Sequence, residues 1–357
     1  MTKTFVSDLT SGQPVDTVFL VRDKAVATTR DGRPYLNVNL IDRTGKVGAK
    51  LWEKRDDPGY VQRTFESFQK DEFVRVVGRV DMYKETMQLI LDDLFVTDAS
   101  AVDISDFLPS GDIDPEKLAR ELKQITDTIE DPSIQKLMDA FFTDKEFMVR
   151  FKRAPAAKKL HQAYLGGLIE HTALLVKLAV SVADFYPHVN RDLLIAGAFL
   201  HDIGKIEELA YDRSFDYTDR GRLVGHLMIG ARMVQEKINA IKDFPEETAN
   251  LILHLILSHH GELQFGSPVV PVIPEAVLLH HIDHMDATVW GFLGEVERSA
   301  DVEGSWSKFS NVYQRYIYSG DRFFGQQPER ESLSGNNTTG KQKVVSLSLF
   351  DDEEGDE

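Results

Sequence analysis

The sequence predicts a multidomain protein in which a small all-β barrel precedes an all-α helical bundle. Two observations support this prediction. Residues 17–97 mostly alternate apolar and polar side chains with a period of two, whereas from Asp114 to about Gly320 the apolar residues recur every three or four positions. The length of 357 residues also exceeds what one hydrophobic core usually serves.

The amino-terminal part reads as three strands, one helix and two further strands. The predicted strands cover residues 17–26, 36–40, 47–51, 73–83 and 87–96. Val61, Phe65 and Phe68 have helical spacing and predict a helix between the third and fourth strands. This order is that of an OB-fold, a barrel that commonly holds single-stranded nucleic acid. We therefore place an OB-fold nucleic-acid-binding domain at residues 1–100.

The helical part begins at Asp114, where a capping residue precedes a proline at the first helical position. We expect a helical connector at residues 101–145 and a helical domain at residues 146–320. Residues 321–357 lose periodicity and end in acidic residues, so we expect a disordered tail. Within it, Val344–Phe350 is apolar and is either a docking segment or a short strand.

The net charge of −17, from 41 Lys and Arg against 58 Asp and Glu, argues by itself against a polyanionic partner. The charge is unevenly distributed, however. Residues 1–55 hold ten basic residues against six acidic ones, and residues 145–160 hold six against one. Local basic surfaces therefore keep nucleic acid among the candidate partners.

The chain contains no cysteine, which excludes disulfides, thiolate zinc sites and thiol nucleophiles. A reducing cytoplasm fits this composition. Apolar runs such as Leu193–Leu200 are far shorter than a membrane helix, and residues 1–10 hold no apolar signal core. We expect a cytoplasmic protein with no membrane partner.

Several histidines and aspartates lie where helical periodicity turns them toward a core. His171 belongs to an apolar stripe, His201-Asp202 directly follows the apolar run Leu193–Leu200, and His259 continues another apolar stripe. A lone imidazole in such a position is usually a hydrogen-bonded packing residue. Several of them on separate helices favour a divalent cation, because each buried polar group then gains a partner.

The spacing of His171, His201-Asp202 and Asp283 resembles the H…HD…D signature of HD-domain metal-dependent phosphohydrolases. Residues 201–205 read His-Asp-Ile-Gly-Lys and match its common extension. With His226 and the pair His259-His260, the pattern resembles HD proteins that hold two metals. Joined to the predicted OB-fold, residues 5–320 are similar to the YhaM-type 3'-to-5' exoribonucleases of bacteria. The sequence departs from that family at His161-Gln162, where two histidines are expected.

The resemblance implies two metal positions that share Asp202. The first would use His171, His201, Asp202 and Asp283, and the second would use Asp202, His226, His259 and His260. Asp286 is a rival to Asp283, which the motif favours. Nitrogen and oxygen ligands suit Mn²⁺, Fe²⁺, Co²⁺ or Mg²⁺, and the many imidazoles favour Mn or Fe over Mg. Such ions lower the pKa of water, so that hydroxide attacks phosphorus in line.

Further residues are candidates for contact with the substrate. Lys205, one turn after His201, either stabilises the phosphoryl transition state or is a solvated charge at a helix end. The remaining candidates are either nucleic-acid contacts or ordinary surface and packing residues: Arg153, Lys158, Lys159, His161 and Arg222 as basic groups, and Tyr35 and Trp52 as base-stacking rings in the barrel.

These expectations combine into a metal-dependent exonuclease that cleaves phosphodiester bonds of single-stranded RNA, or also DNA, from the 3' end to nucleoside 5'-monophosphates. The direction and the preference for RNA come from the resemblance. One alternative is an HD phosphohydrolase that acts on a nucleotide or a cyclic dinucleotide. Another is a non-catalytic OB-fold RNA-binding adaptor, against which the ligand set and Lys205 argue.

Overall fold

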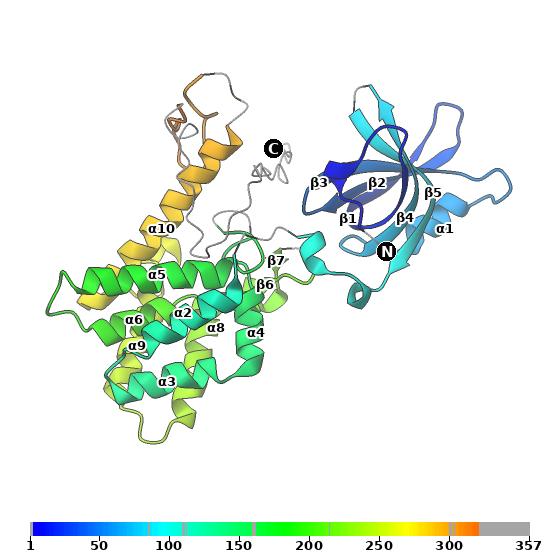
Figure 1. The fold of residues 1–357 in the computed structure, drawn as a ribbon. Coiled ribbons are helices and arrows are strands. Elements are labelled where there is room, and N and C mark those ends of the chain that lie inside the picture. Colours follow the sequence, from blue (N-terminus) through cyan, green and yellow to red (C-terminus); the bar gives the residue numbers. More distant parts are fainter. Residues whose placement is uncertain are drawn as a thin grey trace, which may run out of the picture. The chain divides into compact units, whose positions relative to one another are not determined.

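The computed structural model of the protein describes residues 3–84, 86–108, 111, 113–158, 162–213, 215–299, 302 and 304–320. The chain divides into two compact units, residues 1–109 with 297–357 and residues 110–296 (Figure 1). Among the described residues, no helix combines the length and apolar character that spanning a bilayer requires.

The first unit contains a closed five-stranded barrel. Its elements are β1 (Pro14–Thr28), β2 (Pro34–Asp42), β3 (Gly45–Trp52), α1 (Tyr60–Glu66), β4 (Phe73–Tyr83) and β5 (Thr86–Thr97). The strand order is β1-β2-β3-β5-β4, with β3 and β5 parallel and the other pairs antiparallel. This arrangement confirms the predicted OB-fold. Alternate residues such as Phe19, Leu36 and Leu89 are buried inside, which explains the period of two in the sequence.

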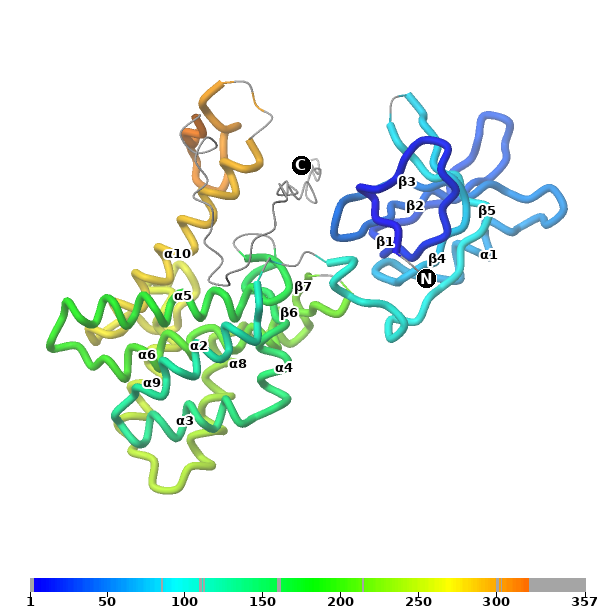
Figure 2. Tube along the Cα trace, in the orientation of Figure 1, coloured from blue at the N-terminus to red at the C-terminus, as the bar shows by residue number. Residues whose placement is uncertain are grey.

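Nine α-helices and one small hairpin follow among the described residues. They are α2 (Pro115–Thr126), α3 (Pro132–Phe142), α4 (Lys145–Arg153), α5 (Gly167–Ala183), α6 (Arg191–Leu200), α7 (Lys205–Glu208), β6 (Leu209–Ala210), β7 (Asp216–Tyr217), α8 (Asp219–Ala240), α9 (Glu246–Ser258) and α10 (Pro274–Arg298). Single 3₁₀ turns occupy Val6–Asp8, Ala99–Ala101, Ile104–Asp106 and Leu263–Phe265. The chain trace in Figure 2 follows the same path.

Side-chain caps explain where several of these helices begin. Asp114 accepts hydrogen bonds from the backbone of Glu116 and Lys117, and Asp131 caps α3 in the same way. Asn190 caps α6, and Thr218 caps α8. Because these oxygens satisfy otherwise unpaired N–H groups, the helix starts are fixed locally in the sequence.

A single hydrophobic core joins most of the helices. Every residue of α6 from Leu193 to Leu200 is buried, and α6 packs against α5 and α9. The predicted connector contributes Leu122 of α2 and Leu137 of α3 to this same core. The candidate metal ligands lie on α5, α8 and α10 and just after the ends of α6 and α9.

The expectation of helical structure up to Gly320 is wrong for its last part. The final described helix, α10, ends at Arg298, and the described residues after it form extended pairs. Trp306 pairs with Tyr318, and the backbone N–H of Ser307 donates to the carbonyl of Ile317. Alternating aromatic and serine residues favour such extended pairing over a helix. The predicted tail at residues 321–357, with Val344–Phe350, lies outside the described residues.

Candidate metal centre

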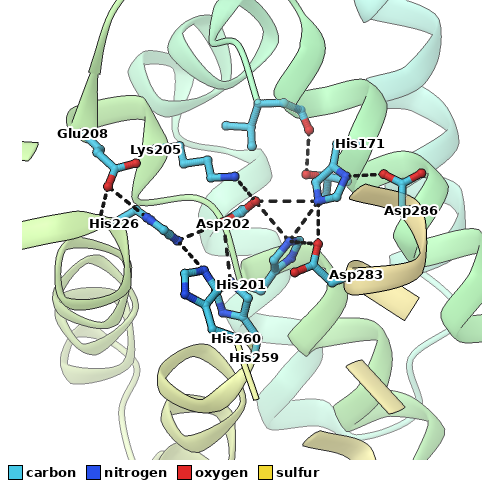
Figure 3. A network of polar contacts seen from close by, with 12 residues as sticks. His171, His201, Asp202, Lys205, Glu208, His226, His259, His260, Asp283 and Asp286 are labelled. Atoms are coloured by element: carbon cyan, nitrogen blue, oxygen red, sulfur yellow. Dashed lines mark hydrogen bonds and ion pairs between the residues drawn. The ribbon is translucent and has the colours of Figure 1, made fainter. Parts of the chain in front are cut away.

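Seven predicted ligands converge on one buried position in the helical unit (Figure 3). They come from five elements: His171 lies on α5, His201 and Asp202 follow α6, His226 lies on α8, His259 and His260 follow α9, and Asp283 lies on α10. His171, His201, Asp202 and His259 are buried. Residues separated by more than a hundred positions thus meet in one cluster.

Asp202 lies between two groups of side chains, and each of its oxygens faces one group. Its Oδ2 is 3.3 Å from His201 Nε2 and 3.7 Å from His171 Nε2. Its Oδ1 is 3.4 Å from His226 Nε2 and 3.7 Å from His259 Nε2. The carboxylate is therefore placed to bridge two neighbouring positions.

Within each group, the ligand atoms that face the centre lie at similar distances from one another. His171 Nε2 lies 3.2 Å from His201 Nε2 and 3.3 Å from Asp283 Oδ1. On the other side, His226 Nε2 lies 3.3 Å from His260 Nε2. Ligands at right angles around one ion, each about 2.1 Å away, lie about 3 Å apart. The donor spacing therefore fits the first coordination shell of a divalent cation.

The outer nitrogens of the imidazoles determine which nitrogen faces the centre. Nδ1 of His201, His259 and His260 lies 2.8–3.0 Å from the backbone carbonyls of Ala198, Ile256 and Phe265. A carbonyl only accepts hydrogen bonds, so each Nδ1 carries the proton and each inward Nε2 presents a lone pair. Burial also lowers the pKa of His259 well below its usual value, which keeps this ring neutral. Neutral imidazoles with inward lone pairs are the form that binds metals.

One buried atom shows that the cluster lacks a partner within the described residues. Asp202 Oδ1 is buried and has no hydrogen-bond donor there, although it faces two imidazole nitrogens. An unpaired buried carboxylate oxygen is costly. A cation between Oδ1 and these lone pairs would remove this cost, so the residues present fit a divalent metal ion.

Two glycines let α8 approach the cluster closely. A Cβ atom at Gly204 would lie 2.1 Å from the carbonyl oxygen of His226 and 2.7 Å from the nitrogen of Gly230, so only glycine fits there. Gly225 has a φ of 75° and interrupts the helical backbone of α8 immediately before His226. Backbone contact and kink together turn His226 toward Asp202.

Lys205 contacts the bridging carboxylate directly. Its Nζ lies 2.6 Å from Asp202 Oδ2, and the side chain is largely buried. Burial opposes the charged form of Asp202, but the positive charge of Lys205 holds its pKa well below the usual value. Burial likewise opposes the charged form of Lys205, yet Asp202 raises its pKa overall. The centre thus contains a buried ion pair with one further oxygen turned to the imidazoles.

Asp283 and Asp286 occupy opposite sides of His171. Asp283 lies beside the inward Nε2, whereas Asp286 Oδ2 lies 2.7 Å from the outward Nδ1. Burial opposes protonation of this ring, but the two carboxylates raise the pKa of His171 to about 9. The geometry therefore puts Asp283 among the inward donors and makes Asp286 a residue that orients His171.

Glu208 plays the same part for His226 and is absent from the sequence prediction. Its Oε1 accepts from the backbone N–H of His226 at 3.0 Å and lies 2.9 Å from Nδ1 of the same residue. Glu208 is buried at the end of α7, three residues after Lys205. Residues three apart on a helix lie on the same face, so its spacing from Lys205 is a sequence signal that could have identified Glu208.

The structure describes three of the basic residues predicted to contact the substrate, Arg153, Lys158 and Arg222. Lys158 Nζ lies 2.8 Å and Arg222 Nη2 lies 2.9 Å from the same atom, Asp216 Oδ1. Arg153 Nη2 lies 3.7 Å from Asp212. Lys159 and His161 lie outside the described residues. The structure therefore brings Lys158 and Arg222 together, which their separation in the sequence does not indicate.

In the barrel, Tyr35 and Trp52 are cross-strand partners on β2 and β3. Their ring centroids are 4.9 Å apart, and Trp52 is 41% exposed. Lys50 Nζ lies 5.8 Å from the Tyr35 ring and 5.2 Å from the ring of Tyr83. The two predicted rings thus form a partly exposed aromatic pair with a cation beside it.

Family models match a segment of each unit. The model of the HD domain matches residues 168–288, and that of the OB-fold nucleic acid binding domain matches residues 18–97. The solved second OB-fold domain of replication protein A from Methanococcus maripaludis is 17% identical, with a TM-score of 0.21. The match covers 27% of this chain and 96% of that domain.

Curated relatives match most of the chain. The 3'-5' exoribonuclease YhaM of Bacillus subtilis (strain 168) is 35% identical over 281 residues, which cover 77% of this chain and 85% of the relative. The protein of the same name from Listeria monocytogenes serotype 4b (strain CLIP80459) is 34% identical over 286 residues, covering 79% and 88%. Identity at this level across both units confirms the predicted resemblance, and the chain belongs to the family of YhaM-type 3'-5' exoribonucleases.

Proposed function

We propose that this protein is a 3'-to-5' exonuclease that hydrolyses single-stranded RNA to nucleoside 5'-monophosphates with two divalent metal ions. The observation that carries the proposal is the position of Asp202, whose two oxygens face two separate groups of ligand atoms. Family membership supports the substrate class and the direction.

The proposal assigns each group of donors to one ion. His171, His201 and Asp283 would hold the first ion, and His226, His259 and His260 the second, with Asp202 shared between them. When bound, such a pair of ions lowers the pKa of water and neutralises charge on a phosphodiester. The imidazole-rich donor set favours Mn²⁺ or Fe²⁺ over Mg²⁺.

Lys205 supplies a positive charge to the same centre. Its ammonium group has three N–H donors, and Asp202 Oδ2 takes one of them. The remaining donors can bind a non-bridging phosphate oxygen as negative charge develops there during hydrolysis. A fixed cation of this kind, in a site shielded from water, stabilises the transition state more than the ground state.

The barrel would contribute affinity for the strand. An exposed aromatic pair, Tyr35 with Trp52, offers a surface on which bases stack, and Lys50 beside it suits the phosphate backbone. Stacking of this kind tolerates any base because every base has a π face. The proposal therefore gives binding of the strand to the barrel and cleavage to the helical unit.

The decisive experiment follows two copies of one RNA oligonucleotide, labelled at the 5' or the 3' end, in the presence of Mn²⁺. We expect the 5'-labelled strand to shorten one nucleotide at a time, and the 3'-labelled strand to release its label at once as a mononucleotide. Asp202→Ala should abolish both changes. Asp184→Ala, at the exposed carboxyl end of α5, is the matched control. A metal-loaded protein that leaves single strands intact, or that releases the 5' label first, contradicts the proposal.

A further inference from the structure

We infer that Tyr217, Lys158 and Arg222 form a subsite that binds one unpaired nucleotide of the strand entering the metal centre. This inference rests on the proposed function and adds to it a specific contact on the helical unit. The Tyr217 ring is 42% exposed. Lys158 Nζ and Arg222 Cζ each lie 5.8 Å from its centroid. An exposed ring beside two cations offers a partner to both the base and the phosphate of a nucleotide.

The charges of the group match one phosphodiester. Both cations bind a single oxygen of Asp216, at 2.8 Å and 2.9 Å. Two positive charges and one negative charge leave a net charge of about +1, which is opposite to the charge of one phosphate in the backbone. The carboxylate also holds the two flexible side chains beside the ring, which lowers the entropy lost when a ligand binds.

The group is built from three separate segments of the chain. Lys158 lies in the loop after α4, Tyr217 lies on β7, and Arg222 lies in the first turns of α8. Cations that are neighbours on one helix face are usually only solvated. Here a loop, a strand and a helix of one compact unit converge on the same carboxylate, so tertiary structure creates the arrangement.

A short hairpin connects this group to the metal centre. Tyr217 pairs with Leu209 across β6 and β7. The residue before Leu209 is Glu208, whose carboxylate holds His226. The backbone N–H of Thr218, the residue after Tyr217, donates to the Glu208 carbonyl at 2.9 Å. This pairing puts the backbone of Tyr217 opposite the residue that follows Glu208, and the proposal places a nucleotide on the Tyr217 ring along the path of a strand that reaches the ligand set.

The chemistry of the group defines what it recognises. A tyrosine face stacks on any base that is free of its own neighbours, so the subsite accepts unpaired nucleotides with little sequence preference. A base inside a duplex is already stacked on both faces. The subsite therefore distinguishes an unpaired strand from a duplex before cleavage, without reading the sequence.

An abasic scan tests this inference with the full-length, Mn²⁺-loaded protein. A single abasic nucleotide is moved, one position at a time, from the 3' end of an RNA oligonucleotide. We expect the wild-type kcat/KM to fall about 5- to 100-fold when the gap occupies the subsite. Tyr217→Ala should raise KM for the intact strand by a similar factor and remove this position dependence. Tyr217→Phe keeps the ring and should restore the wild-type profile.

The matched control is Tyr186→Ala, which removes a tyrosine of similar exposure, 53%, after α5. It should keep the wild-type profile. Affinity for the same oligonucleotides, measured by fluorescence anisotropy, provides a second readout that needs no turnover. If Tyr217→Ala destabilises the hairpin, Tyr217→Leu replaces it, with thermal melting as the check.

The outcomes separate the two proposals. A wild-type scan without a sensitive position, or a Tyr217→Ala scan that keeps it, overturns the subsite while RNA hydrolysis stands. If the wild type cleaves no RNA, the proposed function fails, and the anisotropy scan alone decides the subsite. Asp216→Asn provides an independent test, based on the direction in which the affinity for the strand changes. The substitution raises the local charge while the amide oxygen still accepts hydrogen bonds from both cations, so it should tighten strand binding and steepen the salt dependence. Weaker binding with a shallower salt dependence would count against the subsite.

Discussion

Lys205 donates to one oxygen of Asp202, and the other oxygen of Asp202 has no hydrogen-bond donor among the described residues. The two oxygens of the Asp202 carboxylate therefore have different surroundings. Oδ2 is paired with a cation of the protein itself, Lys205, whereas Oδ1 faces imidazole lone pairs and requires a positive charge from outside. This inequality determines what each substitution in the centre should do.

Replacing the bridging carboxylate should remove metal and activity together. In Asp202→Asn the side chain keeps its size but loses its charge, so His226 and His259 lose the carboxylate that faces their Nε2 atoms, and His171 and His201 keep only Asp283 beside theirs. We expect kcat to fall at least about a hundredfold. Bound metal, measured by elemental analysis after gel filtration, should drop below two ions per chain. Two ions and a wild-type rate in this variant would show that Asp202 does not bridge.

Removing the lysine should affect turnover and spare metal binding. Lys205→Met deletes a cation that repels metal ions but would stabilise phosphate charge. We expect kcat to fall about 10²- to 10³-fold while Mn²⁺ affinity stays the same or increases. Lys205→Arg keeps the charge and should recover part of the rate. A loss of metal in Lys205→Met, with kcat unchanged once metal is restored, would instead indicate a purely structural ion pair.

The two carboxylates behind the imidazoles should act on different ions. Glu208→Gln loosens His226, and Asp286→Asn loosens His171. Each change should weaken one of two Mn²⁺ binding steps by about 10- to 100-fold. Isothermal titration of the two variants resolves the steps. The idea fails if both variants weaken the same step or if neither weakens any.

Metal should also stabilise the folded helical unit. Binding to the native state alone contributes about 2.7 kcal/mol per site when the free ion is at a hundred times Kd. For a unit of this size, we expect a rise in Tm of about 5–10 °C per site. Thermal melting of the full chain in EDTA and in Mn²⁺ measures the shift. Asp202→Asn should reduce it, and equal melting of the wild type in both buffers would contradict a metal-filled centre.

Asp144 provides a test of stability that is separate from the metal centre. It lies 2.7 Å from Lys237 of α8 and caps α4 by accepting from the N–H of Phe147, and these two contacts together hold its pKa below the ordinary 3.8. Asp144→Ala should cost about 1 kcal/mol at pH 7. Because the folded-state pKa is the lower one, this stabilisation is present above pH 3.8 and is lost as pH falls through the folded-state pKa. Urea unfolding at pH 7 and pH 3 measures the change, and a deficit that is undiminished at pH 3 would contradict the assignment.

The sequence by itself determined the architecture and the principal side chains of the candidate site. Period-two alternation and the Asp114-Pro115 cap are local patterns, and they hold because backbone geometry repeats every few residues. The HDxGK motif and its histidines follow a family spacing, and the structure brings all seven predicted ligands together. Periodicity did not extend to residues 302–320, where short bridges leave no repeat to detect.

Only the tertiary structure decided the contacts between distant segments. Glu208 reaches His226 because Gly204 lets two backbones touch and Gly225 turns α8. Tyr217 lies beside Lys158 and Arg222 because a hairpin with two residues in each strand, too short to leave a periodic signal, packs beside α8. Such contacts depend on packing between elements far apart in the chain, and local sequence patterns carry no record of that distance.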